Sequence, residues 1–174
     1  MAELVDALVS NTNEETRAGS TPALGTNSNF FKIILKKQEK YDRAYLKMAQ
    51  EWAKLSHCTR KKVGALIVKD RMIISDGYNG TPSGFENSCE IDNKTKWEVL
   101  HAEANAILKC AKHGTSCNES TLYLTLSPCK ECSKLIHQSG IKRVVFVEKY
   151  KDTTGIDFLK KAKVKVIEFD KNKL

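Results

Sequence analysis

The chain has 174 residues, of which 41% are hydrophobic and 29% are charged, and its formal net charge at pH 7 is +8. This length allows one hydrophobic core of ordinary size and argues against a second comparable domain. The sequence contains no secretory leader and no apolar run of membrane-spanning length, so we expect no membrane partner and a cytoplasmic location. In such a reducing compartment the six cysteines are not expected to form disulfides.

Residues 1–29 differ in composition from the rest of the chain. Asn, Thr, Ser, Gly and Glu dominate residues 10–29, and no apolar periodicity runs through them. We expect residues 1–29 to be disordered, or to be a spurious extension whose reading frame begins inside a neighbouring tRNA gene. Residues 30–174 are then the folded domain.

The next segments predict a helix, a hairpin and a loop. Apolar residues at helical spacing predict an amphipathic helix over 41–55 that packs on a sheet. Two short β-rich runs, 63–68 (VGALIV) and 72–75, are separated by a turn at 69–70 and predict a hairpin. Residues 76–84 (DGYNGTPSG) contain three glycines, which predicts a loop whose backbone can approach a ligand closely.

Two later segments begin with residues that can bind a metal. His101-Ala102-Glu103 opens an alanine-rich segment that predicts a helix starting at His101. Twenty-eight residues after His101, Cys129 opens a second segment, with Ser127 as the expected N-cap and Pro128 as the first helical residue. Cys129 and Cys132 then fall in the first helical turn, on one face and near the positive end of the helix dipole, which favours thiolates.

The remaining elements alternate between strand and helix. Apolar runs predict strands at 121–126, 144–147 and 164–169, with a helix at 129–138 and another at 156–162. This alternation predicts an α/β sandwich whose later strands run parallel through right-handed crossovers. Both metal-binding helices should begin at one edge of the sheet, where α/β folds place their ligands.

The residue types favour a catalytic zinc site. Zinc accepts His nitrogen and Cys thiolates, and a site with three protein ligands keeps its fourth position for water. His101, Cys129 and Cys132 are three such ligands, and Glu103 is a carboxylate suited to proton transfer. A structural zinc with a further ligand is the alternative, and it would leave Glu103 without a role.

These motifs resemble a known family. H-x-E followed by P-C-x-x-C is the signature of zinc-dependent nucleobase deaminases. With VGALIV, DGYNGTPSG and TLSPC, it makes residues 41–169 similar to a deoxycytidylate (dCMP) deaminase of the cytidine deaminase superfamily. The resemblance implies a three-layer α/β/α sandwich with a mixed five-stranded sheet. It also implies zinc-dependent hydrolysis of dCMP to dUMP and ammonia, which supplies dUMP for thymidylate synthesis.

The family further implies a homo-oligomer, a hexamer in many relatives, and regulation by dCTP and dTTP. The zinc motifs alone leave open a deaminase that acts on a polynucleotide, such as tRNA adenosine or cytidine in single-stranded nucleic acid. The positive net charge would suit that partner as well. The glycine-rich loop and the absence of a long basic tail favour the free nucleotide.

The resemblance also implies residue roles. His101, Cys129 and Cys132 bind zinc, and Glu103 carries a proton from water to N3 of the pyrimidine. The residues expected to contact the substrate are Asn79 at the sugar, the Ala102 N–H at the base O2, the Ser127 carbonyl at the amino group, and Tyr150. Asn79 as a simple turn residue and Tyr150 as a half-buried aromatic are the alternatives.

An effector site is predicted from charge. Arg60, Lys61 and Lys62 precede the first strand of the hairpin, and Asn79 and Gly80 follow its second strand. A hairpin therefore brings these cations beside exposed backbone N–H groups, which suits a triphosphate such as dCTP with Mg²⁺. We expect Arg60, Lys62, Asn79 and Gly80 to form this site; a solvated charge run is the alternative.

The other cysteines and histidines are assigned no chemistry. Four cysteines are expected to be buried free thiols: Cys58, Cys89, Cys110 and Cys117. Some relatives bind a second, structural zinc with a cysteine at the position of Cys58, and Cys89 lies near another such ligand, but their histidine-bearing insertion is absent here. Three histidines are expected at the surface: His57, His113 and His137.

Overall fold

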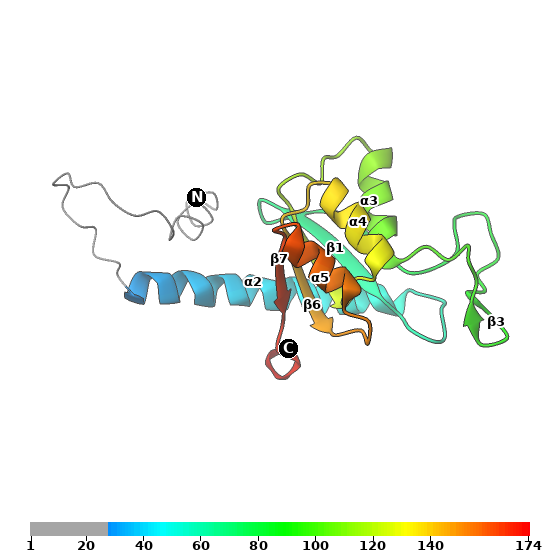
Figure 1. Ribbon diagram of the computed structural model, residues 1–174, viewed down its shortest axis with the longest axis horizontal. Coiled ribbons are helices and arrows are strands. Elements are labelled where there is room, and N and C mark those ends of the chain that lie inside the picture. The colour runs from blue at the N-terminus through cyan, green and yellow to red at the C-terminus, as the bar shows by residue number, and fades with distance from the viewer. Residues whose placement is uncertain (1–27) are drawn as a thin grey trace. The chain divides into compact units, whose positions relative to one another are not determined.

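The structure is a computed structural model that describes residues 28–174 (Figure 1). The segment expected to be disordered or spurious lies outside the described residues, except for Ser28 and Asn29, which begin the first helix. The chain divides into two units, residues 1–37 and residues 38–174. The second unit contains the sheet and every element after the first helix.

The described elements alternate as the sequence predicts. In chain order they are α2 (Ser28–Lys54), β1 (Gly64–Lys69), β2 (Met72–Tyr78), β3 (Glu90–Ile91), β4 (Lys94–Thr95), α3 (Ala102–Lys112), β5 (Thr121–Leu126), α4 (Lys130–Gln138), β6 (Arg143–Glu148), α5 (Thr154–Lys161), β7 (Lys165–Glu168) and the short 3₁₀ helix η1 (Lys171–Lys173). Among the helices of this part of the chain, none combines the length and the apolar character needed to cross a bilayer.

The main sheet has five strands in the order β2-β1-β5-β6-β7. β1 pairs antiparallel with both β2 and β5, whereas β5, β6 and β7 run parallel. The parallel pairs are joined through α4 and α5, as parallel neighbours require a crossover. The prediction of a mixed five-stranded sheet with parallel later strands is confirmed.

Helices cover both faces of this sheet. On one face Leu46 and Ala49 of α2 pack with Leu66, Tyr123 and other buried side chains of the strands. The opposite face is covered by α3, α4 and α5 (Figure 1), whose buried residues join a larger cluster with Ile67 of β1. Each fully buried Leu or Ile contributes about 1.5–3 kcal/mol to folding. The arrangement is therefore a three-layer α/β/α sandwich.

Two glycines let helices approach the hairpin of β1 and β2 closely. A Cβ at Gly64 would clash with the Ala49 carbonyl and the Ala53 nitrogen of α2, and one at Gly77 would clash with Ala102 and Ala106 of α3. Both contacts are with helix backbone, which cannot move aside without shifting the helix. Gly77 thus sets the position of the α3 N-terminus, where His101 lies.

Strand register brings the predicted site to one edge of the sheet. The amino end of β1 lies opposite the carboxyl end of β2, because Gly64 pairs with Tyr78. The carboxyl ends of β5 and β6 meet at the pair Leu126 and Glu148. Since β1 is antiparallel to β5, all four ends share this edge. The loops after β2, β5 and β6 therefore converge there, as is usual for α/β ligand sites.

Several predicted boundaries are wrong. α2 begins at Ser28 rather than at residue 41, because residues 28–40 contain no Gly or Pro and residues 35–40 (LKKQEK) are all good helix formers. The hairpin turn is at Asp70-Arg71, which both have positive φ as a two-residue type I′ turn requires, and β2 continues to Tyr78 into the predicted loop. α5 starts at Thr154, two residues early, and the short hairpin β3–β4 was not predicted.

A buried ion pair holds α2 to the sheet. Asp42 accepts hydrogen bonds from Arg143 Nη1 at 2.9 Å and from the Tyr123 hydroxyl at 2.8 Å. Gln38 Nε2 also donates to Asp42, at 2.9 Å. The Asp42 carboxylate raises the pKa of the Arg143 guanidinium against the opposing effect of burial. This network lies in the α2 layer, on the opposite side of the sheet from α3, α4 and α5.

Candidate metal centre and active-site pocket

Three ligand atoms gather where two helices begin. His101 is the N-cap of α3, and Cys129 is the N-cap of α4. His101 Nδ1 lies 3.5 Å from Cys129 Sγ and 3.4 Å from Cys132 Sγ, and all three atoms lie within 4.8 Å of one another. In residues 28–174 this is the one such group of three.

These separations fit zinc. Tetrahedral bonds of about 2.0 Å to nitrogen and 2.3 Å to sulfur place the N and S atoms roughly 3.5 Å apart. The donor set of one imidazole and two sulfurs is also one that zinc accepts. His101, Cys129 and Cys132 would hold the ion, and no fourth His, Cys, Asp or Glu of the described chain joins the group.

The helix start at the second ligand pair differs from the prediction. Cys129, not Ser127, is the N-cap of α4, and Pro128 lies before the helix. The Cys129 sulfur accepts from the Cys132 N–H at 3.5 Å, so it takes the place of the expected serine oxygen. Both sulfurs still lie at the positive end of the helix dipole, which favours anionic ligands.

The two neighbouring sulfurs shift each other's pKa in opposite directions. The hydrogen bond from Cys132 lowers the pKa of Cys129 to about 3, with the His101 hydrogen bond adding to the effect against burial. In turn the Cys129 sulfur and burial raise the pKa of Cys132, and the Cys129 hydrogen bond raises that of His101. Metal binding therefore has to displace a proton from this pair.

Glu103 is buried beside the ligands. It lies in the first turn of α3 and is 4% exposed. Burial raises the pKa of its carboxyl to about 7, against the lowering effect of its own backbone hydrogen bond and of His101. A carboxyl with this pKa can both accept and donate a proton near neutral pH. His101, Cys129, Cys132 and Glu103 together form what we call the metal wall.

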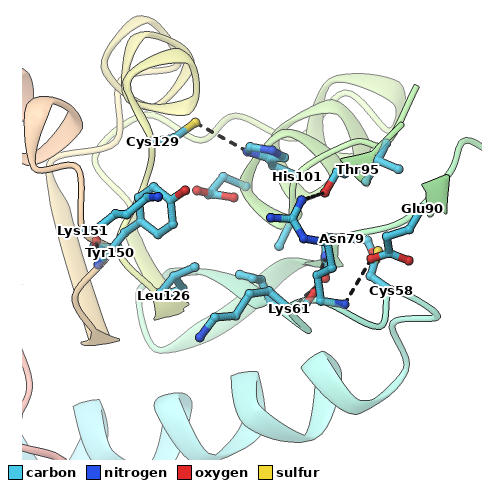
Figure 2. A pocket seen from close by; sticks show the side chains of 16 residues that line it. Cys58, Lys61, Asn79, Glu90, Thr95, His101, Leu126, Cys129, Tyr150 and Lys151 are labelled. Atoms are coloured by element: carbon cyan, nitrogen blue, oxygen red, sulfur yellow. Dashed lines mark hydrogen bonds between the residues drawn. The ribbon is translucent and has the colours of Figure 1, made fainter. Parts of the chain in front are cut away.

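Three residues of the metal wall, His101, Glu103 and Cys129, line a cavity of about 390 Å³. Most of the predicted site residues line it: His101, Ala102, Glu103, Ser127, Cys129, Asn79, Arg60 and Tyr150. Three cationic side chains, Arg60, Lys61 and Lys151, line it as well and form what we call the cationic wall. In Figure 2, His101 and Cys129 lie together, with Tyr150 and Lys151 on another side of the cavity and Lys61 below them.

The family follows from comparison with known proteins. Residues 39–148, more than half of the chain, match the family described as the cytidine and deoxycytidylate deaminase zinc-binding region. The chain belongs to this deaminase family. It is 36% identical over 163 residues to the deoxycytidylate deaminase of Enterobacteria phage T4, across 68% of this chain and 84% of that protein.

Other deaminases agree with this assignment. The deoxycytidylate deaminase of Mycobacterium phage D29 is 38% identical over 121 residues, which cover 61% of this chain and 93% of that protein. The crystal structure of the dCMP deaminase from cyanophage S-TIM5, in complex with dCMP and dUMP, superposes with a TM-score of 0.71 at 46% identity. It covers 73% of this chain and 95% of that one.

In this deaminase domain Asn79 has a defined structural task. Its Oδ1 accepts from the Val63 N–H at 2.8 Å, and its Nδ2 donates to the Lys61 carbonyl at 2.8 Å. These bonds clamp the loop after β2 to the segment before β1, so they hold Lys61 at the cavity. The amide nitrogen carries two hydrogens. One of them bonds to the Lys61 carbonyl, and the other can donate to the sugar, as predicted.

The loop after β6 is held by Ser127. The Ser127 hydroxyl accepts from the Tyr150 N–H at 2.8 Å, and the Ser127 N–H donates to the Glu148 carbonyl at 2.8 Å. Ser127 is buried, whereas Tyr150 is 37% exposed. The serine side chain therefore positions the segment that carries Tyr150 and Lys151. This role was not predicted from the sequence.

The four residues predicted for an effector do not share one cavity. Arg60 and Asn79 line the larger cavity, whereas Lys62 lines a separate one of about 160 Å³ that also includes Lys61 and Glu148. Gly80 pairs with Leu100 through two backbone hydrogen bonds of 3.1 and 2.9 Å. Arg60 thus lies at the same cavity as the metal ligands.

Two expectations about the other cysteines are wrong. Cys58 and Cys89 form a disulfide, although disulfides were not expected and both residues were predicted to be free thiols. The two cysteines are 31 residues apart, so no local sequence pattern indicates that they pair. The folding of the loops brings them together. Cys110 and Cys117 are buried free thiols as predicted, and the three remaining histidines, His57, His113 and His137, are exposed.

Four residues that line or brace the cavity were missed by sequence reasoning. Lys151 directly follows Tyr150, which was predicted to contact the substrate. Its position in the loop after β6, at the edge of the sheet where the site lies, could have identified it. Glu90 and Thr95 belong to the unpredicted hairpin β3–β4 and also line the cavity. Val99 lines it too, beside the disulfide. Nothing in their local sequence marks these side chains as part of a site.

Proposed function

We propose that this protein converts dCMP to dUMP and ammonia by zinc-dependent hydrolysis. The observation that carries the proposal is geometric: the buried Glu103 lies beside a group of three metal-ligand side chains, at a cavity that cationic side chains also line. In this proposal the pyrimidine base lies beside Glu103, and the 5′-phosphate lies near the cationic side chains Arg60, Lys61 and Lys151 of the same cavity. The dCMP deaminase of cyanophage S-TIM5, which crystallised with dCMP and dUMP, supports this substrate.

The chain's own residues move the protons. When bound, zinc supplies acidity, because it lowers the pKa of a coordinated water to about 7. Glu103 accepts a proton from the water that adds to C4 and delivers it to N3 of the base. Glu103 then takes the second proton from the hydroxyl group now on C4 and passes it to the amino nitrogen. The carbon–nitrogen bond breaks, and ammonia leaves as the C4 carbonyl forms. The sum is dCMP plus water to dUMP plus ammonia.

Backbone groups orient the base. Ala102 is the first residue of α3 and lines the cavity, so its N–H is one of the unpaired donors of a helix N-terminus and suits the base O2. The Ser127 carbonyl suits the amino group that leaves. Asn79 and Tyr150, which also line the cavity, suit the sugar and the base. Groups placed by helix ends and clamped loops lose little freedom when the substrate binds.

Effector binding by dCTP or dTTP with Mg²⁺ stays a prediction, as do a homo-oligomer and a cytoplasmic location. The position of Arg60 at the zinc cavity favours a contact with the substrate phosphate over an effector contact. A shift of the dCMP concentration at half-maximal rate on addition of dCTP and Mg²⁺ would support regulation. Velocity curves that neither dCTP nor dTTP changes would contradict it.

A product assay separates the candidate substrates. The zinc-loaded protein is incubated with dCMP, CMP, deoxycytidine, dCTP or a tRNA anticodon arm, and the products are resolved by chromatography. We expect dUMP to form from dCMP far faster than any other product forms, with loss of the reaction in Glu103→Gln. Faster conversion of the RNA than of dCMP would overturn the proposed function and favour a polynucleotide deaminase.

A further inference from the structure

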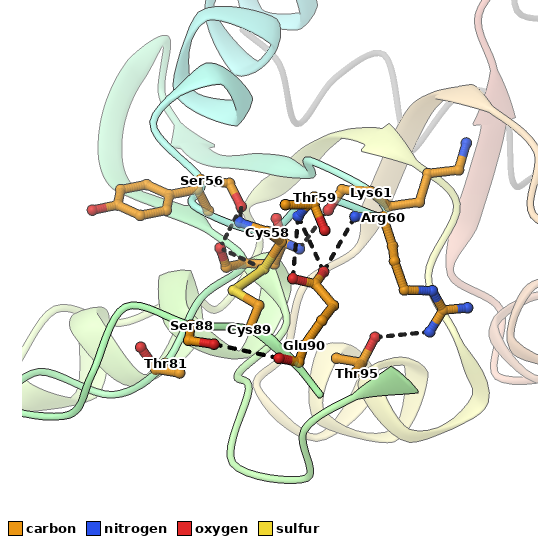
Figure 3. The surroundings of a disulfide bond; sticks show 12 residues. Ser56, Cys58, Thr59, Arg60, Lys61, Thr81, Ser88, Cys89, Glu90 and Thr95 are labelled. Atoms are coloured by element: carbon orange, nitrogen blue, oxygen red, sulfur yellow. Dashed lines mark hydrogen bonds between the residues drawn. A yellow bond between two sulfur atoms is a disulfide. The ribbon is translucent and has the colours of Figure 1, made fainter. Parts of the chain in front are cut away.

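Arg60 is held at the cavity by a hairpin that no motif contains. The Glu90 carboxylate accepts from the backbone N–H groups of Thr59, at 3.1 and 3.3 Å, and of Arg60, at 3.2 Å. Thr95 Oγ1 accepts from Arg60 Nη1 at 3.1 Å. Figure 3 shows both sets of contacts, with the Arg60 side chain reaching toward Thr95. One hairpin therefore fixes both the backbone and the guanidinium of this arginine.

The two bracing residues form a unit. Glu90 on β3 and Thr95 on β4 are direct partners in the antiparallel register. The connecting residues Asp92 and Asn93 both have positive φ, as in a two-residue type I′ turn, which holds the two strands in a fixed register. A shift of either strand would move Glu90 and Thr95 together. The pair can therefore orient Arg60 more tightly than two independent loop residues could.

A covalent link aligns the hairpin with Arg60. The disulfide joins Cys58 to Cys89, which are the residues immediately before Thr59 and Glu90. Both cysteines are buried and pack with Val99. The two segments are thus tied together one residue away from the hydrogen bonds between Glu90 and the N–H groups of Thr59 and Arg60, so that those groups stay within bonding distance of the carboxylate.

The pattern of charges leaves Arg60 able to bind an anion. The carboxylate of Glu90 is occupied by backbone N–H groups, whereas the guanidinium is held by a neutral hydroxyl. Within residues 28–174, Arg60 forms no ion pair of 4 Å or shorter with a carboxylate, although Lys61 lies 3.6 Å from Glu148. Arg60 does interact electrostatically with the Glu90 carboxylate, whose pKa it helps to lower. An oriented guanidinium that no carboxylate contacts directly keeps N–H donors for two hydrogen bonds to a phosphate.

We propose that Glu90 and Thr95 are positioning residues that orient Arg60 toward the 5′-phosphate, so that the hairpin β3–β4 sets the preference for a nucleotide over a nucleoside. This inference rests on the proposed function, and it adds the residues that decide which substrate class enters the same cavity. Arg60 touches the phosphate, and Glu90 and Thr95 act through Arg60.

The test compares dUMP with deoxyuridine, which lacks only the phosphate. Binding of each to the zinc-loaded full chain is measured by calorimetry, and the ratio of the two affinities is the readout. We expect Arg60→Ala to lower this ratio roughly 10- to 100-fold, the loss of a hydrogen-bonded charge pair. Thr95→Val, which keeps the shape but removes the acceptor, should lower it roughly 3- to 10-fold, and Glu90→Ala should act in the same direction.

Controls separate positioning from folding. Thr95→Ser retains the hydroxyl and should restore the wild-type ratio. Glu86→Gln changes an exposed carboxylate outside the cavity lining and should leave the ratio unchanged. In the Arg60→Ala background, Thr95→Val should lower the ratio no further, because the two residues act as one unit. A merely structural role would weaken both ligands equally and leave the ratio as it is.

The outcomes are distinct. An unchanged ratio in Arg60→Ala, or equal losses for dUMP and deoxyuridine in Thr95→Val, would overturn the inference. If the wild-type protein neither deaminates dCMP nor binds dUMP, the proposed function itself is wrong. A wild-type protein that produces dUMP and discriminates strongly for it, together with the graded losses above, supports both.

Discussion

Residues of the metal wall and of the cationic wall line the same cavity, but the two walls are built differently. In the metal wall His101 and Cys129 are the N-caps of α3 and α4, and Glu103 and Cys132 lie in the first turns of these helices. Arg60 in the cationic wall lies in a loop and is oriented by residues 30 and 35 positions away. The difference teaches that short motifs place the residues of the metal wall, whereas contacts between distant segments orient Arg60.

Removal of a metal ligand should break the metal wall most severely. We expect Cys132→Ala to lose both zinc and turnover, because two protein ligands remain where three are needed. Zinc per chain by elemental analysis and the dCMP deamination rate are the two measurements. Full zinc content in this variant would show that the ligand set is wrong. Cys117→Ala, which changes a buried free thiol outside the metal group, is the matched control.

Glu103→Gln tests the same wall without removing the metal. The amide keeps the shape of the side chain but cannot carry a proton, so turnover should fall by roughly 10²- to 10⁴-fold. Zinc content and the unfolding midpoint should stay close to those of the wild-type protein. Turnover within a factor of a few of the wild-type rate would contradict the assignment of Glu103 as the proton carrier.

Asp42→Ala should lower the stability of the whole protein without acting specifically on the metal wall or the cationic wall. Removing this carboxylate leaves Arg143 buried without its partner, so the free energy of unfolding should fall by about 3–5 kcal/mol. Urea denaturation measures the change. The control is Glu39→Ala, which removes a more exposed ion pair with Lys173 and should cost about 1 kcal/mol or less. Similar losses in both variants would mean that the buried network is not what holds α2.

Reduction of the disulfide that lies next to Arg60 of the cationic wall should lower the stability of the protein. Cross-linking residues 31 positions apart is expected to contribute about 4 kcal/mol to the free energy of unfolding. A thiol reductant should therefore lower the unfolding midpoint of the wild-type protein and not that of Cys58→Ala/Cys89→Ala. Identical wild-type curves with and without reductant, or two zinc ions per chain, would show that Cys58 and Cys89 are not paired with each other.

Patterns within a few residues predicted much of the fold. β5 lies at the expected residues 121–126, because an apolar strand bounded by turn residues has few alternatives. α4 ends where Gly140 adopts a positive φ. The metal ligands and Glu103 could be predicted for the same reason, since each pair lies within one helical turn. The error at the α4 N-cap arose because a cysteine sulfur replaced the usual serine oxygen.

Contacts between distant segments could not be predicted. The strands β3 and β4 have two residues each, too few to show a hydrophobic period. Their place beside Arg60 depends on the disulfide and on hydrogen bonds across about 30 residues. The effector cluster was predicted because Arg60 and Lys62 are neighbours in sequence, yet their side chains line different cavities.

The most direct test of the account follows the oxygen atom during turnover. The zinc-loaded protein is incubated with dCMP in water enriched in ¹⁸O, and the product is analysed by mass spectrometry. Hydrolysis by the metal wall predicts dUMP that carries one ¹⁸O at C4, one ammonia released for each dUMP formed, and almost no product from Glu103→Gln. Unchanged dCMP, or dUMP without the label, would contradict the central claim that this cavity performs hydrolytic deamination of a nucleotide.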